Sequence, residues 1–247
     1  MNEVIELLNN HRSIRSFTDK KLDQDTIETL VKAAQSASTS SYVQAYSIIG
    51  VTDETLKAQL REVSGQSYVE DNGHLFVFVM DYNRHTLLSE ENGTDVSFKD
   101  TEKLLVGAID VALAAQNLAV AAESMNLGIC YIGSLRNNVS RVIELLNLPN
   151  GVFPLFGMVV GEPNEQGSQK ERLPFEAVYF ENTYKSLEDD EVKSAVDQYD
   201  QNISDYYKER TNGERNDKWS EQVTNMLSKK IRLDVHDVLK SQGFIQQ

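Results

Sequence analysis

Five consecutive residues near the start of the chain, His11-Arg12-Ser13-Ile14-Arg15, concentrate groups that bind anions. They supply two guanidinium groups, an imidazole and a hydroxyl, and the planar guanidinium fork matches phosphate oxygens two at a time. A second basic segment, Lys170-Glu171-Arg172, lies far along the chain. We interpret these segments as a first and a second phosphate clasp, although a basic pentapeptide can also be a solvated turn.

Motifs for several other cofactors and for metals are absent from the sequence. There is no GxxxxGK[ST] and no GxGxxG after an expected strand, which argues against a P-loop NTPase and a Rossmann dinucleotide domain. HExxH, CxxC and closely spaced histidine pairs are also missing, so we expect no catalytic metal site. The two clasps and the hydroxyl-rich run Ser36–Ser41 therefore favour a phosphorylated cofactor bound without a glycine-rich loop.

The composition restricts the partners and the compartment. The 247 residues have a formal net charge of −14, so nucleic acid and anionic membranes would repel the chain as a whole. The single cysteine, Cys130, excludes an intrachain disulfide, and the N-terminus lacks the pattern of a secretory signal, so we expect the cytoplasm. The longest apolar stretch, residues 104–122, is interrupted by Asp110 and two amides, which favours a core helix over a membrane span.

Hydrophobic periodicity and capping residues predict helices that alternate with strands around one sheet. Residues 75–80 are apolar on both faces, which places that strand at the centre of the sheet. The expected strands are residues 46–51, 75–80, 129–134 and 153–161, with 129–134 in the interior of the sheet, and a short edge strand at 178–180. Four helices are expected at residues 2–10, 53–63, 101–126 and 234–241, with Gly128 as a left-handed cap after the third and residues 83–99 as a polar insert before it. Two further helices have alternative caps: one is capped by Asp23 or Asp25 and ends at Ser36, and the other is capped by Asn137 or Asn138 and ends at 146. The last expected helix begins with a capping box at Ser186 and Asp189 and ends at 210.

Several segments, taken in order, resemble the flavin-dependent nitroreductase superfamily. The likeness is closest to its NADPH-dependent branch of oxygen-insensitive nitroreductases and flavin reductases. The matching segments are HRSIRSFTD (His11–Asp19), STSSYVQ (Ser38–Gln44), YIGSLRNN (Tyr131–Asn138), FPLFGMVVG (Phe153–Gly161), KERLP (Lys170–Pro174) and YYKERTNGERNDKWS (Tyr206–Ser220). An ordered set that covers essentially the whole chain is specific, whereas no single segment is.

The resemblance implies an α+β nitroreductase-like fold, in which helices flank a central, mostly antiparallel or mixed sheet and a C-terminal extension follows. Residues 1–165 would form the FMN-binding core. Residues 166–247 would complete the FMN site, make dimer contacts and bind NADPH. The implied assembly is a homodimer with FMN at the subunit interface.

The resemblance also implies roles for individual residues. His11, Arg12, Ser13, Lys170 and Arg172 would hold the FMN phosphate, and Arg15 would lie near the N1–O2 edge of the flavin. Thr39, Ser40, Ser41 and Gln44 would line the ribityl chain and the ring, with Gln66 at the polar edge of the ring and Tyr131, Ile132, Gly133 and Ser134 behind it. Ser134 departs from the glycine pair that the family often has, so its side chain must point away from the ring or hydrogen-bond it. Arg210, Arg215 and Arg232 would bind the phosphates of NADPH.

The implied activity is that of an FMN-dependent NADPH oxidoreductase acting on nitroaromatics, quinones or free flavin. NADPH would pass a hydride to flavin N5 and leave before the acceptor binds, which gives ping-pong kinetics. A disulfide or azo reductase on the same fold, and a non-catalytic protein that binds a phosphorylated ligand, remain alternatives.

Overall fold

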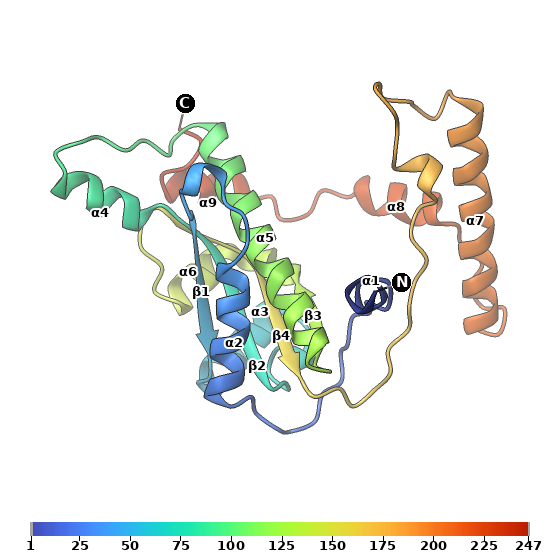
Figure 1. Ribbon diagram of the computed structural model, residues 1–247, viewed down its shortest axis with the longest axis horizontal. Coiled ribbons are helices and arrows are strands. Elements are labelled where there is room, and N and C mark those ends of the chain that lie inside the picture. The colour runs from blue at the N-terminus through green and yellow to red at the C-terminus, as the bar shows by residue number, and fades with distance from the viewer. Residues whose placement is uncertain (1, 247) are drawn as a thin grey trace. The chain divides into compact units, whose positions relative to one another are not determined.

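The computed structural model describes residues 2–246 and divides into two compact units (Figure 1). The first unit comprises Met1–Gln169 with Arg232–Gln247, and the second comprises Lys170–Ile231. Two segments of the predicted extension, residues 166–169 and 232–247, belong to the first unit.

The first unit is built on one four-stranded antiparallel sheet. The strands are β1 (Tyr46–Val51), β2 (His74–Asp81), β3 (Gly128–Ile132) and β4 (Val152–Gly161), in the order β1-β2-β4-β3. All residues of β2 are buried, so the central position predicted for this strand is confirmed. β1 and β3 form the two edges, so the interior position predicted for residues 129–134 is wrong. β3 ends at Ile132 because Gly133 and Ser134 begin a 3-10 turn.

The alternating side chains of β2 contribute to two cores, one on each face of the sheet. Phe76 and Phe78 pack with α2 (Gln24–Gln35) and α5 (Thr101–Ser124), which lie in front of the strands in Figure 1. Val77 and Val79 pack with α3 (Glu54–Ser64) and α6 (Val139–Leu145). Because successive strand residues point to opposite faces, one apolar strand serves both layers.

The helix α5 is the long core helix expected from the sequence. Eight of its residues are buried, including Asp110, and it packs against α2 and β2. Among residues 2–246 it is also the one helix that is long and apolar enough to cross a membrane by length and composition alone, with 39% of its most apolar window buried.

Short polar side chains begin most of the helices. Asp23 caps α2, Asp53 caps α3, Asp100 caps α5 and Asn138 caps α6, each with its side chain accepting a backbone N–H bond. The remaining elements of the first unit are the helices α1 (Glu3–Asn9), α4 (Asn83–Glu91) and α9 (Val235–Ser241), and the 3-10 turns η1 (Ser40–Tyr42), η2 (Ser67–Val69) and η3 (Gly133–Asn138).

The second unit has a small core of its own. Its elements are η4 (Phe175–Ala177), α7 (Asp190–Arg210) and α8 (Trp219–Leu227). Tyr199, Ile203 and Tyr207 of α7 are buried, and Trp219 packs its ring edge against Tyr199 with 5.7 Å between the ring centroids.

Three predicted local features are wrong. Residues 178–180 are not a strand, because the Val178 and Tyr179 amides bond locally to the Phe175 carbonyl. The left-handed residue after α5 is Asn126 rather than Gly128, which is the first residue of β3. Asp189 alone caps α7.

Two helices were also missed. The expected polar insert contains α4, and α8 was not predicted. Both helices have nine residues, which is short for a periodic pattern to be recognised.

Candidate functional site

The first clasp, His11–Arg15, lies along the edge strand β3. Ser13 forms a parallel β-bridge with Ile129, and the Ile14 amide donates a hydrogen bond of 2.9 Å to the Ile129 carbonyl. The Ile14 side chain is buried over Gly128, where a Cβ atom would come within 2.7 Å of it. Glycine at position 128 therefore allows the clasp to lie against the sheet edge.

The segment that follows β4 fixes the clasp backbone. The Arg15 amide donates to Oε1 of Glu165 at 2.7 Å, and the Asn164 amide donates to the Ser16 carbonyl at 2.9 Å. Gly167, with φ of 64°, turns the chain beside Ser13 and Ile14. The clasp is thus held from two segments that are distant in sequence.

The two clasp arginines keep their charge available. Nε of Arg12 donates to the Asn10 carbonyl at 3.1 Å, and within residues 2–246 neither Arg12 nor Arg15 forms an ion pair with a carboxylate. Guanidinium groups without an acidic partner are suited to an anionic ligand such as a phosphate.

His11 is oriented by a carboxylate that the sequence did not indicate. Its Nδ1 lies 2.6 Å from Oε1 of Glu123, at the end of α5, and the Glu123 side chain is mostly buried. A carboxylate on one ring nitrogen fixes the orientation of the imidazole and leaves the other nitrogen for a ligand.

A pocket of about 400 Å³ opens beside the clasp. Arg12 and Glu123 belong to its wall, together with Asn10 and Ile14. The clasp therefore faces a concave surface large enough to receive part of a ligand.

Cys130 is a buried structural thiol. It is 3% exposed, and burial raises the pKa of the thiol, while the nearby Arg15 guanidinium opposes that rise. Burial also raises the pKa of the neighbouring Tyr68 hydroxyl. A thiol with a raised pKa is a poor nucleophile, so no chemistry is assigned to it.

The hydroxyl-rich segment forms a strained loop between α2 and β1. Ser41, Tyr42 and Gln44 all have positive φ, at 48°, 61° and 54°. Each such non-glycine residue costs about 1–3 kcal/mol and persists only where its surroundings hold it. The hydroxyl of Thr39 is turned inward to Asp110 of α5, at 2.6 Å, whereas Tyr42 is 81% exposed.

The residues expected behind the flavin ring lie where β3 ends. Tyr131 donates its hydroxyl to Gln116 of α5 at 3.2 Å, and burial raises its pKa to about 12. Ile132 is buried, and Gly133 and Ser134 open η3 half-buried. Gln66 is half-buried between α3 and η2, and its amide donates to the Ser64 hydroxyl at 3.1 Å.

The clasp and the strained loop contact different parts of α5. Glu123 beside the clasp and Asp110 beneath the loop are thirteen residues apart on this helix. That spacing corresponds to about 20 Å along the axis and to nearly opposite faces. A single chain therefore does not bring these two predicted parts of the flavin site together.

The second unit gathers four predicted basic residues around tyrosine rings of α7. Arg215 lies 4.2 Å from the centre of the Tyr207 ring, and Lys170 reaches the Tyr207 hydroxyl at 3.4 Å. Arg210 donates to the Tyr206 hydroxyl at 3.0 Å, and Arg172 donates to the Lys170 carbonyl at 2.7 Å. Lys170 and Arg215, expected to bind different phosphates, thus share one ring.

Arg232 belongs to the first unit and differs from the other two NADPH candidates in its surroundings. It has φ of 55°, and its Nε donates to Oδ1 of Asn137 at 3.2 Å. Burial, with the Arg232 charge adding to its effect, lowers the pKa of Arg136 on η3, so the two guanidinium groups lie near each other.

Sequence reasoning missed Glu123 and Asp110 as members of the site. Asp110 did give a signal, because a carboxylate interrupts an otherwise apolar helix, but it was interpreted only as an argument against a membrane span. Glu123 gave none, since acidic residues near helix ends are common.

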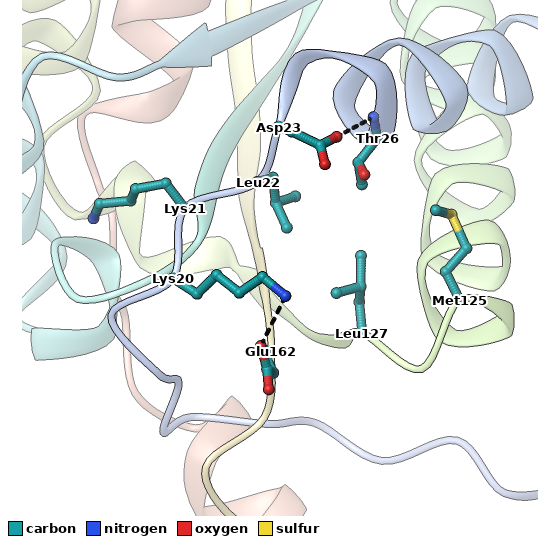
Figure 2. A pocket seen from close by; sticks show the side chains of 8 residues that line it. All are labelled: Lys20, Lys21, Leu22, Asp23, Thr26, Met125, Leu127 and Glu162. Carbon is teal, nitrogen blue, oxygen red and sulfur yellow. Dashed lines mark hydrogen bonds and ion pairs between the residues drawn. The ribbon is translucent and has the colours of Figure 1, made fainter.

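A separate pocket of about 150 Å³ lies between the segment before α2 and the end of α5 (Figure 2). Lys20 pairs with Glu162 across it at 3.4 Å, and Leu22 and Leu127 form its apolar part. None of the predicted site residues lines it, so we assign it no role in the site.

Comparisons with known proteins cover both units. The model of the nitroreductase family matches residues 8–162, and the model of the nitroreductase family C-terminal domain matches residues 170–247. The chain is similar to an NADPH-dependent oxidoreductase of Staphylococcus haemolyticus, with 55% identity over 99% of this chain and 98% of the relative. It is similar to the FMN reductase (NADPH) of Bacillus subtilis, with 53% identity over 99% of each chain.

Solved structures show the same relationship. The NfrA1 nitroreductase of B. subtilis matches with a TM-score of 0.96 and 52% identity, over 99% of this chain and all of that one. The NADPH:FMN oxidoreductase of Vibrio harveyi matches with a TM-score of 0.89 and 38% identity over the full length of both. The α+β fold predicted from the sequence is confirmed, and the chain belongs to the nitroreductase family.

Proposed function

We propose that this chain is an FMN-dependent NADPH oxidoreductase that reduces nitroaromatics, quinones or free flavin. The observation that supports this most is the clasp on β3, where two guanidinium groups have no ion-pair partner within residues 2–246 and one of them, that of Arg12, lines a pocket. The relatives named FMN reductase (NADPH) and NADPH-dependent oxidoreductase favour an enzyme over a non-catalytic binding protein.

The donor set of the clasp fits the phosphate of FMN. Arg12 and Ser13 supply a guanidinium and a hydroxyl, and His11 offers the ring nitrogen that Glu123 leaves free. The second clasp, Lys170 and Arg172, adds two further cations to this role in our proposal. The fit rests on charge and donor type, because phosphate oxygens accept charge-assisted hydrogen bonds.

The ring of FMN is assigned to the surface that continues from the clasp along β3. Arg15 follows the phosphate residues directly, and a fixed cation there would stabilise negative charge at the N1–O2 edge. Gln66 would contact the polar edge of the ring, and Tyr131–Ser134 would lie behind it. When bound, FMN supplies the chemistry, because it accepts a hydride from NADPH and passes electrons to the acceptor.

We propose that the loop of the partner subunit completes each site in a homodimer. Within one chain the clasp and the loop contact different faces of α5, so Ser40, Ser41 and Gln44 would reach the flavin of the other subunit. The exposed side of α5 also presents an apolar stripe, Leu105, Ile109 and Leu113, at helical spacing. A stripe of this kind on a long helix is suited to a symmetric interface.

Arg210 and Arg215 are our candidates for the phosphates of NADPH, with Arg232 as a third. Arg215 is paired with Asp217 at 2.5 Å, whereas Arg210 forms no ion pair within residues 2–246. The chain has a net charge of −14, so a local cluster of cations is needed to attract an anionic reductant.

We propose the cytoplasm as the compartment, in keeping with a free, buried cysteine.

An absorption spectrum tests the proposed function. The purified protein, or the protein after addition of FMN, should show flavin bands that bleach when NADPH is added without oxygen and return when a quinone is added. A protein that remains colourless after incubation with FMN, or whose flavin bands do not respond to NADPH, would contradict the proposal.

A further inference from the structure

The loop of residues 39–45 has a backbone conformation that its residue types do not favour. Ser41, Tyr42 and Gln44 are left-handed although none of them is glycine. Such a conformation is kept only when contacts elsewhere in the fold determine it. Any function that depends on this loop conformation therefore also depends on the contacts that hold it.

One buried carboxylate binds both ends of the loop. Asp110 is 1% exposed, and its Oδ2 accepts bonds from the Thr39 hydroxyl at 2.6 Å and from the Ala45 amide at 3.0 Å. Its Oδ1 accepts a bond from the Ser40 amide at 3.1 Å. The Thr39 hydroxyl in turn accepts a bond from the Gln44 amide at 2.8 Å, which extends the network to a fourth residue of the loop.

Asp110 makes these contacts and forms no ion pair within residues 2–246. A buried carboxylate without a cationic partner is costly unless hydrogen bonds satisfy it. The three donors that satisfy Asp110 all come from the loop. The loop therefore explains why a carboxylate occupies this position of an apolar helix.

Two other contacts support the middle and the end of the loop. Nε2 of His85, on α4, lies 2.8 Å from the Val43 carbonyl, and the Asp81 amide donates to the Ala45 carbonyl at 3.1 Å. Neither contact reaches Thr39 or Ser40. Asp110 is the side chain that ties the start of the loop to its end.

We propose that Asp110 is a positioning residue that holds the loop of residues 39–45 in the conformation that receives FMN. The inference rests on the proposed function, because it assigns the loop to the flavin. Asp110 touches no ligand in this assignment. It acts through the backbone amides of Ser40 and Ala45 and through the hydroxyl of Thr39.

The test is the variant Asp110→Asn, measured for FMN binding and for amide hydrogen exchange. The amide group of asparagine presents hydrogens where the carboxylate accepts two bonds, so the loop should open. We expect the FMN dissociation constant to rise about tenfold or more, and exchange in peptides covering residues 39–45 to accelerate while exchange in β2 and β4 is unchanged.

Asp81→Asn is the matched control. Asp81 is also a buried carboxylate of the first unit, but its side chain binds the Ser47 hydroxyl and Arg84, and the substitution keeps the backbone amide that donates to the Ala45 carbonyl. This variant should leave the FMN dissociation constant and the exchange of residues 39–45 as in the wild type. If Asp110→Asn does not fold, Thr39→Val should weaken FMN binding while Thr39→Ser, which keeps the hydroxyl, should not.

The outcomes separate this inference from the proposed function. If the wild-type protein binds no FMN, both are contradicted. If it binds FMN and Asp110→Asn binds it equally well with unchanged loop exchange, the inference alone is wrong. It is also wrong if Asp81→Asn weakens FMN binding as much as Asp110→Asn, or if Thr39→Val and Thr39→Ser bind FMN alike.

Discussion

The charge of single residues decides which ligands the clasp on β3 attracts. Arg12 has no carboxylate partner within residues 2–246, so its charge is available to a ligand. His11 is different, because Glu123 holds one of its ring nitrogens. The clasp thus combines the unpaired guanidinium of Arg12 with the oriented ring nitrogen of His11. Both groups suit a phosphate ligand.

Arg12→Ala should weaken FMN binding about tenfold to a hundredfold, because it removes a charge-assisted bond to the phosphate. The dissociation constant is measured by the quenching of flavin fluorescence. Arg141→Ala is the control, since Arg141 is exposed on α6 and paired with Glu144 at 3.1 Å. Equal affinities of both variants and the wild type would exclude Arg12 from the phosphate site.

Arg210→Ala should raise the KM for NADPH much more than the KM for NADH, because only NADPH carries the 2′-phosphate. Arg215→Ala should have the smaller effect, since Asp217 already offsets its charge. Steady-state kinetics with both reductants measure the ratio. Equal changes for NADPH and NADH would mean that Arg210 does not recognise the 2′-phosphate.

At the scale of single elements, β2 begins with a histidine that cannot easily take a proton. His74 is buried against Phe76, with ring centroids 4.4 Å apart, and burial lowers its pKa to about 4, with Lys57 on α3 adding to the shift. The ordinary pKa of histidine is 6.5. Between pH 4 and pH 6.5 the unfolded chain therefore binds a proton at His74 that the folded chain does not. This contribution to stability is complete above pH 6.5 and is lost as the pH falls toward 4.

The predicted loss from this one residue between about pH 7 and about pH 5 is about 2 kcal/mol of unfolding free energy. His74→Gln removes the titrating group, so the variant should lose correspondingly less on acidification than the wild type. Chemical denaturation at the two pH values measures the difference. The same acid loss in both proteins would show that His74 is not responsible.

The sequence predicted elements best where periodicity or a cap is strong. The limits of β1 were predicted to the residue, and Asp23 and Asn138 were among the expected caps. The strand expected at 178–180 failed because β-propensity does not provide a neighbouring strand to pair with. The inward role of Asp110 required knowing that the loop of residues 39–45 packs on α5, a tertiary contact that no local pattern contains.

At the scale of the whole molecule, α5 links the two halves of the proposed site. One face of this helix anchors the loop through Asp110, its end orients the clasp through Glu123, and its exposed side carries the apolar stripe. The clasp segment was recognisable from residue types alone, whereas its separation from the loop appears only in three dimensions. The homodimer that we propose would account for that separation.

Ile109→Glu should weaken subunit association, because it places a charge in the middle of the stripe, where Ile109 is 54% exposed in one chain. Sedimentation velocity should show a shift toward monomer together with loss of bound FMN. Leu87→Glu, at a similarly exposed position on α4, is the control and should leave the assembly intact. An unchanged dimer in Ile109→Glu would place the interface elsewhere.

The most direct test of a flavin site shared between subunits is the FMN content of a mixed dimer. One chain would carry Arg12→Ala and the other Asp110→Asn, with different affinity tags so that the mixed species is isolated. If each site combines the clasp of one subunit with the loop of the other, one of the two sites contains no substitution, and we predict about one FMN per mixed dimer where both parent homodimers are nearly empty. A mixed dimer as empty as its parents would show that a single chain supplies both parts, and would contradict the account.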